Sequence, residues 1–174
     1  MKVVGVDPGV HGAIAVFDSG DPATVAAIAF PSHKIVSGKK KRTRLDVDGC
    51  WNLLQTINLV HEPVLAVIED VNGYSGNANA TGAAGFVFGR ATGLIEGMIV
   101  ALGIPRHYEP PATLKKHFRI QGKTRDELKT ASRIAASRLF PKSASLFARV
   151  CDDGPAEAAL MARFGATHVL KIGT

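Results

Sequence analysis

The order of short apolar runs along the 174-residue chain is the feature that most restricts its fold. Three such runs, at 2–7, 12–17 and 24–30, follow one another closely and are separated by glycine and proline. This spacing predicts an antiparallel β-meander. A fourth run, VLAVIE at 64–69, is almost wholly apolar, which predicts a central strand buried on both faces.

Helical patterns alternate with strands in the rest of the chain. The polar segment 32–44 is predicted to be either a mobile loop or an extended hairpin, and 72–81 a loop rich in glycine and asparagine. Helices are predicted at 46–60, 82–102, 111–118, 125–139 and from Asp152 to about residue 164, with one more strand at 104–109. This alternation of strands and helices after the meander indicates a single mixed α/β domain over residues 1–174.

The composition suits a folded domain with a polyanionic partner. Hydrophobic residues make up 46% of the chain, and 21 lysines and arginines against 15 aspartates and glutamates give a net charge of +6. Cys50 and Cys151 are too few for a disulfide framework and form no CxxC metal motif, which indicates a reducing compartment. The first residues do not resemble a signal peptide, and no uncharged stretch of 18 apolar residues occurs. We therefore expect a cytoplasmic protein without a membrane span.

Acidic residues stand at three places where α/β proteins gather ligands. Asp7 ends the first predicted strand, and Glu69, followed by Asp70, ends the apolar central strand. Ligands of α/β sheets bind outside the carboxyl ends of such strands. Asp153 and Glu157 are four residues apart and therefore share one helix face. If these carboxylates converge, they would suit Mg²⁺, which prefers oxygen ligands.

Each carboxylate also has an ordinary structural interpretation. Asp7 precedes Pro-Gly, as turn residues often do, and Asp152 or Asp153 would make a good helix N-cap. Because neighbours on a strand point to opposite faces, only one of Glu69 and Asp70 can face a site. Acidic residues at three separate places together favour a functional site more than any one of them does.

Taken in order, the motifs resemble those of the RuvC-like Holliday junction resolvases of the RNase H-like superfamily, particularly the compact phage-type members. The matching segments are VGVDPGVHGAIAVFD (4–18), LAVIEDV (65–71), FVFGRATGLIEGMIVALGIP (86–105), PATLKKHF (111–118), LKTASRIAASRLFP (128–141) and DDGPAEAALMA (152–162). The resemblance implies an RNase H-like mixed five-stranded sheet, an antiparallel meander plus parallel strands, flanked by helices. It also implies a homodimer that cleaves four-way DNA junctions with two Mg²⁺ ions per site, for which Mn²⁺ can substitute.

The resemblance also assigns residues. Asp7 corresponds to the family's first-strand aspartate, Glu69 to its fourth-strand glutamate, and Asp153 with Glu157 to the acidic pair of the final helix. These four are the implied metal ligands and catalytic acids. The better-known bacterial pattern spaces its helical pair as DxxD, whereas here the spacing is four and the second residue is glutamate. Asp152 therefore remains an alternative to Asp153.

Basic and aromatic residues complete the predicted site. Lys116, or its neighbour Lys115, matches the family's lysine after the fifth strand, and Lys129 matches a helix lysine near the scissile phosphate. We assign Lys116 and Lys129 to catalysis, where they would neutralise phosphate charge. The residues expected to contact DNA are Lys39, Lys40, Lys41, Arg42, Arg44, Tyr74, Lys115 and Arg133, with Tyr74 a candidate to stack on an unpaired base. The ordinary interpretation is solvated surface cations and a loop tyrosine.

Four glycines recur at every fourth position of one predicted helix, at Gly85, Gly89, Gly93 and Gly97. Glycine inside a helix costs about 1 kcal/mol relative to alanine, so the ridge requires an offsetting gain such as close approach of another backbone. Either the helix lies tightly against its own sheet, or it meets its twin across a two-fold axis.

Three functional hypotheses follow from these features. The first is a metal-dependent, structure-selective endodeoxyribonuclease that resolves Holliday junctions, and other branched DNA, in recombination, repair or phage DNA processing. It would act in the bacterial cytoplasm, or in the host cytoplasm if phage-encoded. The alternatives are a noncatalytic branched-DNA-binding protein and an RNA-processing nuclease of the same superfamily. An actin-like ATP-binding fold is excluded because 174 residues are too few for its two lobes.

Overall fold

The computed structural model describes residues 1–37, 40–70 and 82–172, and its centre is a five-stranded sheet. The strands lie in the order β3-β2-β1-β6-β7 and comprise β1 (Lys2–Asp7), β2 (Ala13–Asp18), β3 (Ala26–Ala29), β6 (Leu65–Glu69) and β7 (Arg106–Glu109). β1, β2 and β3 are antiparallel neighbours, whereas β6 runs parallel to β1 and β7 parallel to β6. The predicted mixed sheet is confirmed, with strand ends shifted by one or two residues.

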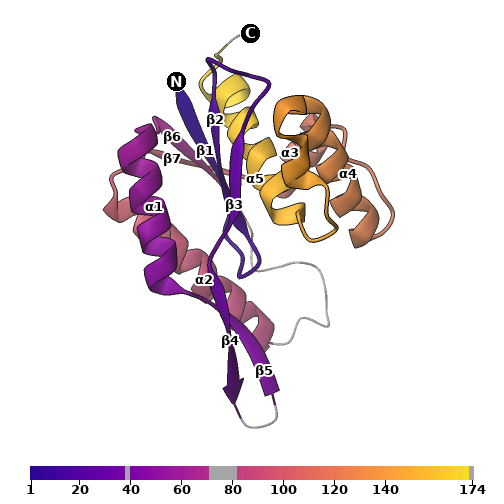
Figure 1. The fold of residues 1–174 in the computed structure, drawn as a ribbon. Helices are drawn as coiled ribbons and strands as arrows, with labels where there is room; N and C mark the ends of the chain where they lie inside the picture. The colour runs from indigo at the N-terminus through magenta and orange to yellow at the C-terminus, as the bar shows by residue number, and fades with distance from the viewer. Residues whose placement is uncertain (38–39, 71–81, 173–174) are drawn as a thin grey trace.

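Helices cover both faces of this sheet (Figure 1). On one face lie α1 (Val47–His61) and α2 (Gly82–Ala101), and on the other α3 (Pro111–His117), α4 (Arg125–Leu139) and α5 (Asp153–Phe164). A 3₁₀ segment, η1 (Pro141–Phe147), links α4 to α5, and a π-helical segment, η2 (Gly165–Val169), extends α5. Among the described residues, no helix is both long enough and apolar enough to cross a membrane. Cys50 and Cys151 are both free thiols.

Strand alternation divides the core into two clusters. Val3 and Val67 belong to the cluster that contains α5, whereas Val4 and Ile68 belong to the cluster under α1 and α2. Odd-numbered residues of β1 and β6 therefore face α5, and even-numbered residues face the opposite way. This parity decides which strand-end side chains can meet α5.

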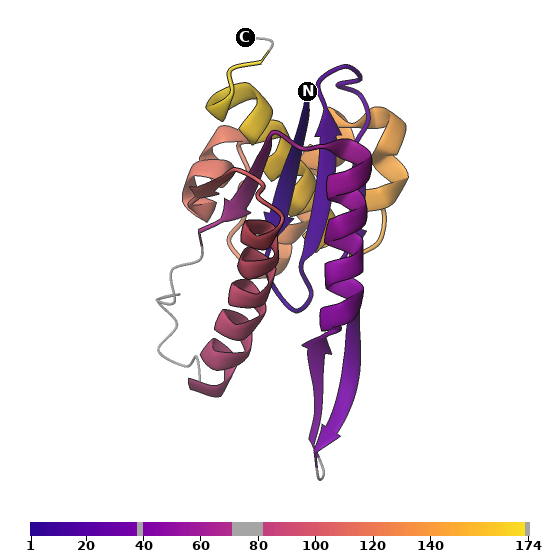
Figure 2. The same cartoon turned by 90° about the vertical axis from the view of Figure 1, so that its left-hand side faces the viewer.

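Segment 32–44, for which a loop and a hairpin were both predicted, forms a hairpin. β4 (Ser32–Ser37) pairs with β5 (Lys40–Leu45) in a separate two-stranded sheet, from Ser32 opposite Leu45 to Ser37 opposite Lys40. The hairpin projects beyond the main sheet alongside the N-terminal half of α2 (Figure 2). The predicted loop at 72–81 lies outside the described residues.

The predicted glycine ridge of α2 faces outward. The opposite side of the helix buries Ala91, Ile95 and Ile99 against the sheet. A Cβ added at Gly85, Gly89, Gly93 or Gly97 would meet no described atom within 4 Å beyond the helix's own nearby backbone. The interpretation in which this ridge packs against the protein's own sheet is therefore wrong.

A different glycine brings α5 against β1. A Cβ at Gly5 would lie 1.9 Å from the carbonyl oxygen of Ala158 and 2.4 Å from the backbone nitrogen of Ala162. Only glycine permits this approach of helix and strand backbones, so Gly5 sets the depth at which the middle of α5 packs on the sheet.

Gly5→Ala should therefore destabilise the protein by about 2–4 kcal/mol, because α5 must shift away from β1. Urea unfolding followed by circular dichroism measures this change. Gly82→Ala is the matched control, since an added Cβ there meets no described neighbour, and it should change the free energy of unfolding by less than about 1 kcal/mol. Equal stability of the two variants would contradict the close contact.

Candidate active site

Asp7 is the last residue of β1 and faces α5. The sequence Asp-Pro-Gly ends the strand and starts a tight turn, in which Gly12 donates a backbone hydrogen bond to Gly9 O (2.9 Å). The backbone N–H of Gly9 also hydrogen-bonds to the Asp7 carboxylate. On the other side of the turn, Thr92 Oγ1 of α2 donates to Pro8 O (3.3 Å). The turn is thus held from both sides, and it holds Asp7 at the sheet edge.

Glu69 ends β6, the parallel neighbour of β1. Val6 pairs with Ile68, so Asp7 and Glu69 are the next residues along two adjacent strands, and both face α5. Asp70 lies beyond the strand end, where its N–H donates to Glu109 O (2.9 Å). By the same alternation its side chain is directed away from the α5 face.

The first turn of α5 brings two more carboxylates. Asp153 and Glu157 are one turn apart, and Gly154 between them lies against the β1–β2 turn. A Cβ at Gly154 would be 2.8 Å from His11 O and 3.4 Å from Asp7 Oδ2. The helix start therefore lies directly beside the Asp7 carboxylate.

Asp152 has a different role from its neighbour Asp153. Asp152 is only 3% exposed, and its carboxylate accepts hydrogen bonds from the Arg149 backbone N–H (2.8 Å) and from Arg149 Nη2 (2.8 Å). These bonds hold the pKa of Asp152 below its ordinary value. The carboxylate is thus used to close the turn before α5, whereas Asp153 acts electrostatically on Asp7.

Burial and neighbouring carboxylates raise the pKa of Asp7, Glu69 and Glu157. Burial, followed by the charges of Glu69 and Glu157, raises the pKa of Asp7 to about 8. Burial and Glu157 likewise raise the pKa of Glu69 to about 7, against the opposing charge of Lys115. The pKa of Glu157 is also raised, first by burial and then by Asp153. The four carboxylates therefore form one electrostatically coupled group, and such groups are common at functional sites.

Two lysines accompany this group. Lys129 of α4 forms an ion pair with Asp153, and Lys115 of α3 opposes the pKa rise of both Glu69 and Glu157. Lys116 is exposed, and it is not among the charges that shift the pKa of Asp7, Glu69 or Glu157. The sequence left open the choice between Lys115 and Lys116. Lys115 is the one close to Glu69 and Glu157, so its position does not support the assignment of catalysis to Lys116.

Two polar residues near these elements were missed by the sequence analysis. Ser132 is buried on α4 and donates to Glu157 Oε1 (3.4 Å) as well as to Leu128 O (3.1 Å). No sequence signal identifies it, because its proximity to Glu157 depends on how α4 packs on α5. Glu109 ends β7 beside Glu69 and hydrogen-bonds to His107 Nε2 (2.9 Å). The sequence could have indicated Glu109, because it ends a predicted strand as Asp7 and Glu69 do.

The predicted DNA contacts are spread over several elements. Lys41, Arg42 and Arg44 are exposed on β5. Arg133 is partly buried and donates to the carbonyls of Ala148 (3.4 Å) and Arg149 (3.2 Å), so those donors serve the packing of α4, and a DNA contact by Arg133 stays a prediction. Lys40 belongs to β5, but its side chain, like the whole of Lys39 and Tyr74, lies outside what the structure describes.

Similarity to solved structures identifies the fold. No family model and no curated protein sequence matches the chain. The structure is similar to T. thermophilus RuvC in complex with a Holliday junction substrate, with a TM-score of 0.59 and 13% identity over 98% of this chain and 96% of that one. It is also similar to the fowlpox virus Holliday junction resolvase, with a TM-score of 0.52 and 13% identity over 98% and 99% of the two chains. The chain has the RNase H-like fold of RuvC-type resolvases.

In this RuvC-like fold the donor chemistry of the site fits a hard divalent cation. All four groups are carboxylates, and a cation would offset the burial and the neighbouring negative charges that raise the pKa of Asp7. Within the described part of the chain, no three acidic, histidine or cysteine side chains are grouped so that they could hold a metal ion as they stand. The ion pair with Lys129 occupies Asp153. The fit therefore lies in donor type and charge, without a preformed coordination sphere.

Asp7→Asn should stabilise the protein when no divalent cation is present. Because the folded pKa of Asp7, about 8, exceeds its ordinary value of 3.8, the folded state binds the proton more tightly, and stability falls as pH rises from about 4 to 8. Asparagine removes this penalty, so we expect a gain on the order of 1–3 kcal/mol at pH 8 and a smaller gain at pH 5.

Urea unfolding in EDTA at the two pH values measures this gain. Asp70→Asn, at the residue after the neighbouring strand end, is the control for loss of a carboxylate outside the group of four. A gain for Asp7→Asn that is equal at pH 5 and pH 8 would contradict the coupling of the four carboxylates.

Proposed function

We propose that the protein is a metal-dependent, structure-selective endodeoxyribonuclease that hydrolyses phosphodiester bonds of Holliday junctions and other branched DNA. Its cellular role would be in recombination, repair or phage DNA processing. The observation that carries the proposal is the coupled group of Asp7, Glu69, Asp153 and Glu157 at one end of the sheet. The likeness of the fold to junction resolvases supports the same conclusion.

The four carboxylates are the proposed ligands of Mg²⁺, or of Mn²⁺ in its place. Two such ions would activate a water molecule and stabilise the leaving oxygen of a phosphodiester. The chain itself positions these ligands through β1, β6 and the first turn of α5, and Ser132 orients Glu157. Lys115 and Lys129 would bind the phosphate beside the scissile bond, because ammonium groups near the carboxylates offset the charge of the substrate.

The two alternative functions differ in observable outcomes. A noncatalytic branched-DNA-binding protein would bind junctions but leave them intact with Mg²⁺ or Mn²⁺. An RNA-processing nuclease of the same superfamily would cleave structured RNA in preference to DNA junctions. The raised pKa values of Asp7, Glu69 and Glu157 are an energetic cost that favours a catalytic site over a purely binding one.

Asp7→Asn and Asp153→Asn should each reduce cleavage of a labelled four-way junction by about 100-fold or more, while junction binding stays within a few-fold of wild type. Asp152→Asn is the matched control: it should retain cleavage but lower the unfolding temperature, because it weakens the bonds to Arg149. Gel assays with Mg²⁺, and binding assays with Ca²⁺, measure the two effects. Full cleavage by Asp7→Asn would refute the proposed site.

We infer that the protein acts as a homodimer joined through α2. The glycine ridge faces outward, and a Cβ added at any of its four glycines would meet no described neighbour within 4 Å. Close approach of a second α2 would offset the helix propensity lost at four glycines. A two-fold dimer would also match the paired strands of a symmetric junction.

Gly93→Leu should disrupt this dimer, because leucine keeps the two helices apart. Light scattering should then give the mass of one 18.4 kDa chain, against twice that mass for wild type. Asn52→Leu introduces the same side chain at an exposed position of α1 and should leave the dimer intact. A monomeric wild type, or an unchanged mass for Gly93→Leu, would remove the ridge from the interface.

A further inference from the structure

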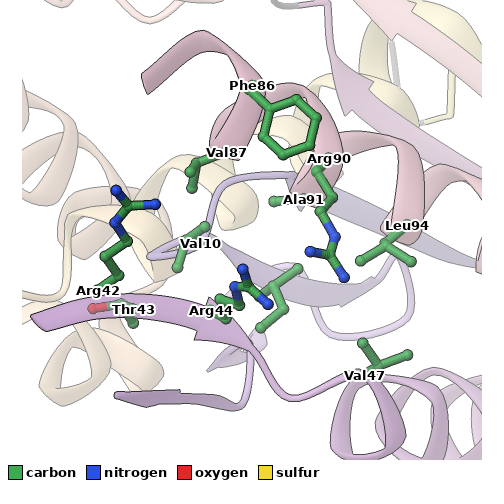
Figure 3. Close-up of a pocket in the computed structure, with 11 residues that line it drawn as sticks. Val10, Arg42, Thr43, Arg44, Val47, Phe86, Val87, Arg90, Ala91 and Leu94 are labelled. Atoms are coloured by element: carbon green, nitrogen blue, oxygen red, sulfur yellow. The ribbon is translucent and has the colours of Figure 1, made fainter. Parts of the chain in front are cut away.

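A pocket of about 180 Å³ lies on the face of the sheet opposite the carboxylates (Figure 3). It is bounded by β5, the N-terminal half of α2, the start of α1 and the β1–β2 turn. Its apolar wall includes Val10, Val47, Val87 and Leu94, and Phe86 stands at its edge. Val10 is three residues after Asp7, so the pocket and the carboxylate group are separated by a single turn.

Three arginines line this pocket, Arg42 and Arg44 from β5 and Arg90 from α2. None of them forms a hydrogen bond or an ion pair with the described residues, and no acidic residue is among those that line the pocket. In Figure 3, Arg44 and Arg90 extend their guanidinium groups from the two elements into the same space. Like charges gathered without a carboxylate favour binding of an anion.

The chemistry of the anion follows from the guanidinium group. Its planar fork of N–H donors matches the oxygens of a phosphate, with which it forms charge-assisted hydrogen bonds. Two such groups, one from a strand and one from a helix, can hold one phosphate between them.

The apolar part of the pocket restricts the ligand further. Phe86 is 70% exposed and Val47 is 41% exposed, so both present apolar surface to solvent at this pocket. An exposed aromatic ring beside phosphate-binding arginines is suited to stacking on a nucleobase. Bases within a continuous duplex are already stacked, so only an unpaired nucleotide can use the ring and the arginines together.

We propose that this pocket binds one unpaired nucleotide of branched DNA, with its phosphate between Arg44 and Arg90 and its base against Phe86. The proposal rests on the proposed function in that it takes branched DNA as the substrate. The strand that carries this nucleotide passes over the β1–β2 turn, on whose other side Asp7 lies. The pocket thus discriminates a branch, with its unpaired nucleotides, from intact duplex.

The test measures dissociation constants by fluorescence anisotropy in EDTA, where no cleavage occurs. The probes are a single-stranded oligonucleotide, a fork with unpaired arms, and a duplex of equal length. Phe86→Ala should weaken binding to the single strand and the fork by about 5- to 100-fold, and to the duplex by less than 2-fold. Arg44→Ala with Arg90→Ala should weaken the same two probes and reduce the salt dependence of their binding by about one phosphate contact.

Matched controls separate the pocket from general effects of charge and apolar surface. Leu59→Ala removes an exposed apolar side chain of α1, and Arg106→Ala removes an exposed arginine on β7, both outside the pocket. Both should bind all three probes within about 2-fold of wild type. The side chain of Phe86 is largely exposed, so its truncation should leave the unfolding temperature close to that of wild type.

Two outcomes would overturn the proposed pocket, and a third would separate it from the proposed nuclease. Equal losses on duplex and single strand would mean that the pocket does not select unpaired nucleotides. Unchanged DNA binding, accompanied by a lower mass in light scattering for Phe86→Ala, would mean that a second copy of the chain covers the pocket. If the wild-type protein leaves junctions intact but Phe86→Ala still weakens single-strand binding, the proposed nuclease is refuted and the pocket is supported.

Discussion

The close grouping of Asp7, Glu69, Asp153 and Glu157 at one end of the sheet is the constraint on which the rest of this structure depends. Gly5 lets α5 lie directly on β1, and Gly154 lets the first turn of that helix reach the Asp7 carboxylate. The result is a pKa of about 8 for Asp7, which is an energetic cost within the folded protein. A protein keeps such a cost where a function needs the groups together, and a bound divalent cation would offset it. The packing of α5 on β1 therefore also determines the chemistry of the site.

The sheet separates two kinds of surface that meet at one end. On the α5 face lie the carboxylates with Lys115 and Lys129, and on the α1–α2 face lie the arginines of the hairpin and Arg90. The β1–β2 turn is their common border, held to α2 by Thr92 and to α5 by the contact at Gly154. Cations therefore lie on both sides of the carboxylate edge, which suits a DNA branch whose strands diverge over that edge.

Much of the fold could be predicted because it depends on local patterns. The apolar runs and their glycine and proline joints predicted β1, β2 and β6, and helical spacing predicted α1, α4 and α5 close to their observed bounds. The hairpin of β4 and β5 could not be separated from a loop, because its side chains are largely polar and its pairing is its main local support. The packing of the glycine ridge was equally undecidable, since the same spacing serves a contact within one chain or between two.

Sequence alone determined that acidic residues end two strands and begin the last helix, because strand ends and helix starts have local signatures. Only the tertiary structure distinguished between neighbours: Asp153 and Glu69, rather than Asp152 and Asp70, act on the Asp7 carboxylate, and Lys115, rather than Lys116, acts on Glu69 and Glu157. The reason is that adjacent residues share the same local signals but point in different directions. Strand parity and the depth at which α5 packs decide which of two neighbours meets a partner from another element. Neither can be predicted from a local sequence pattern.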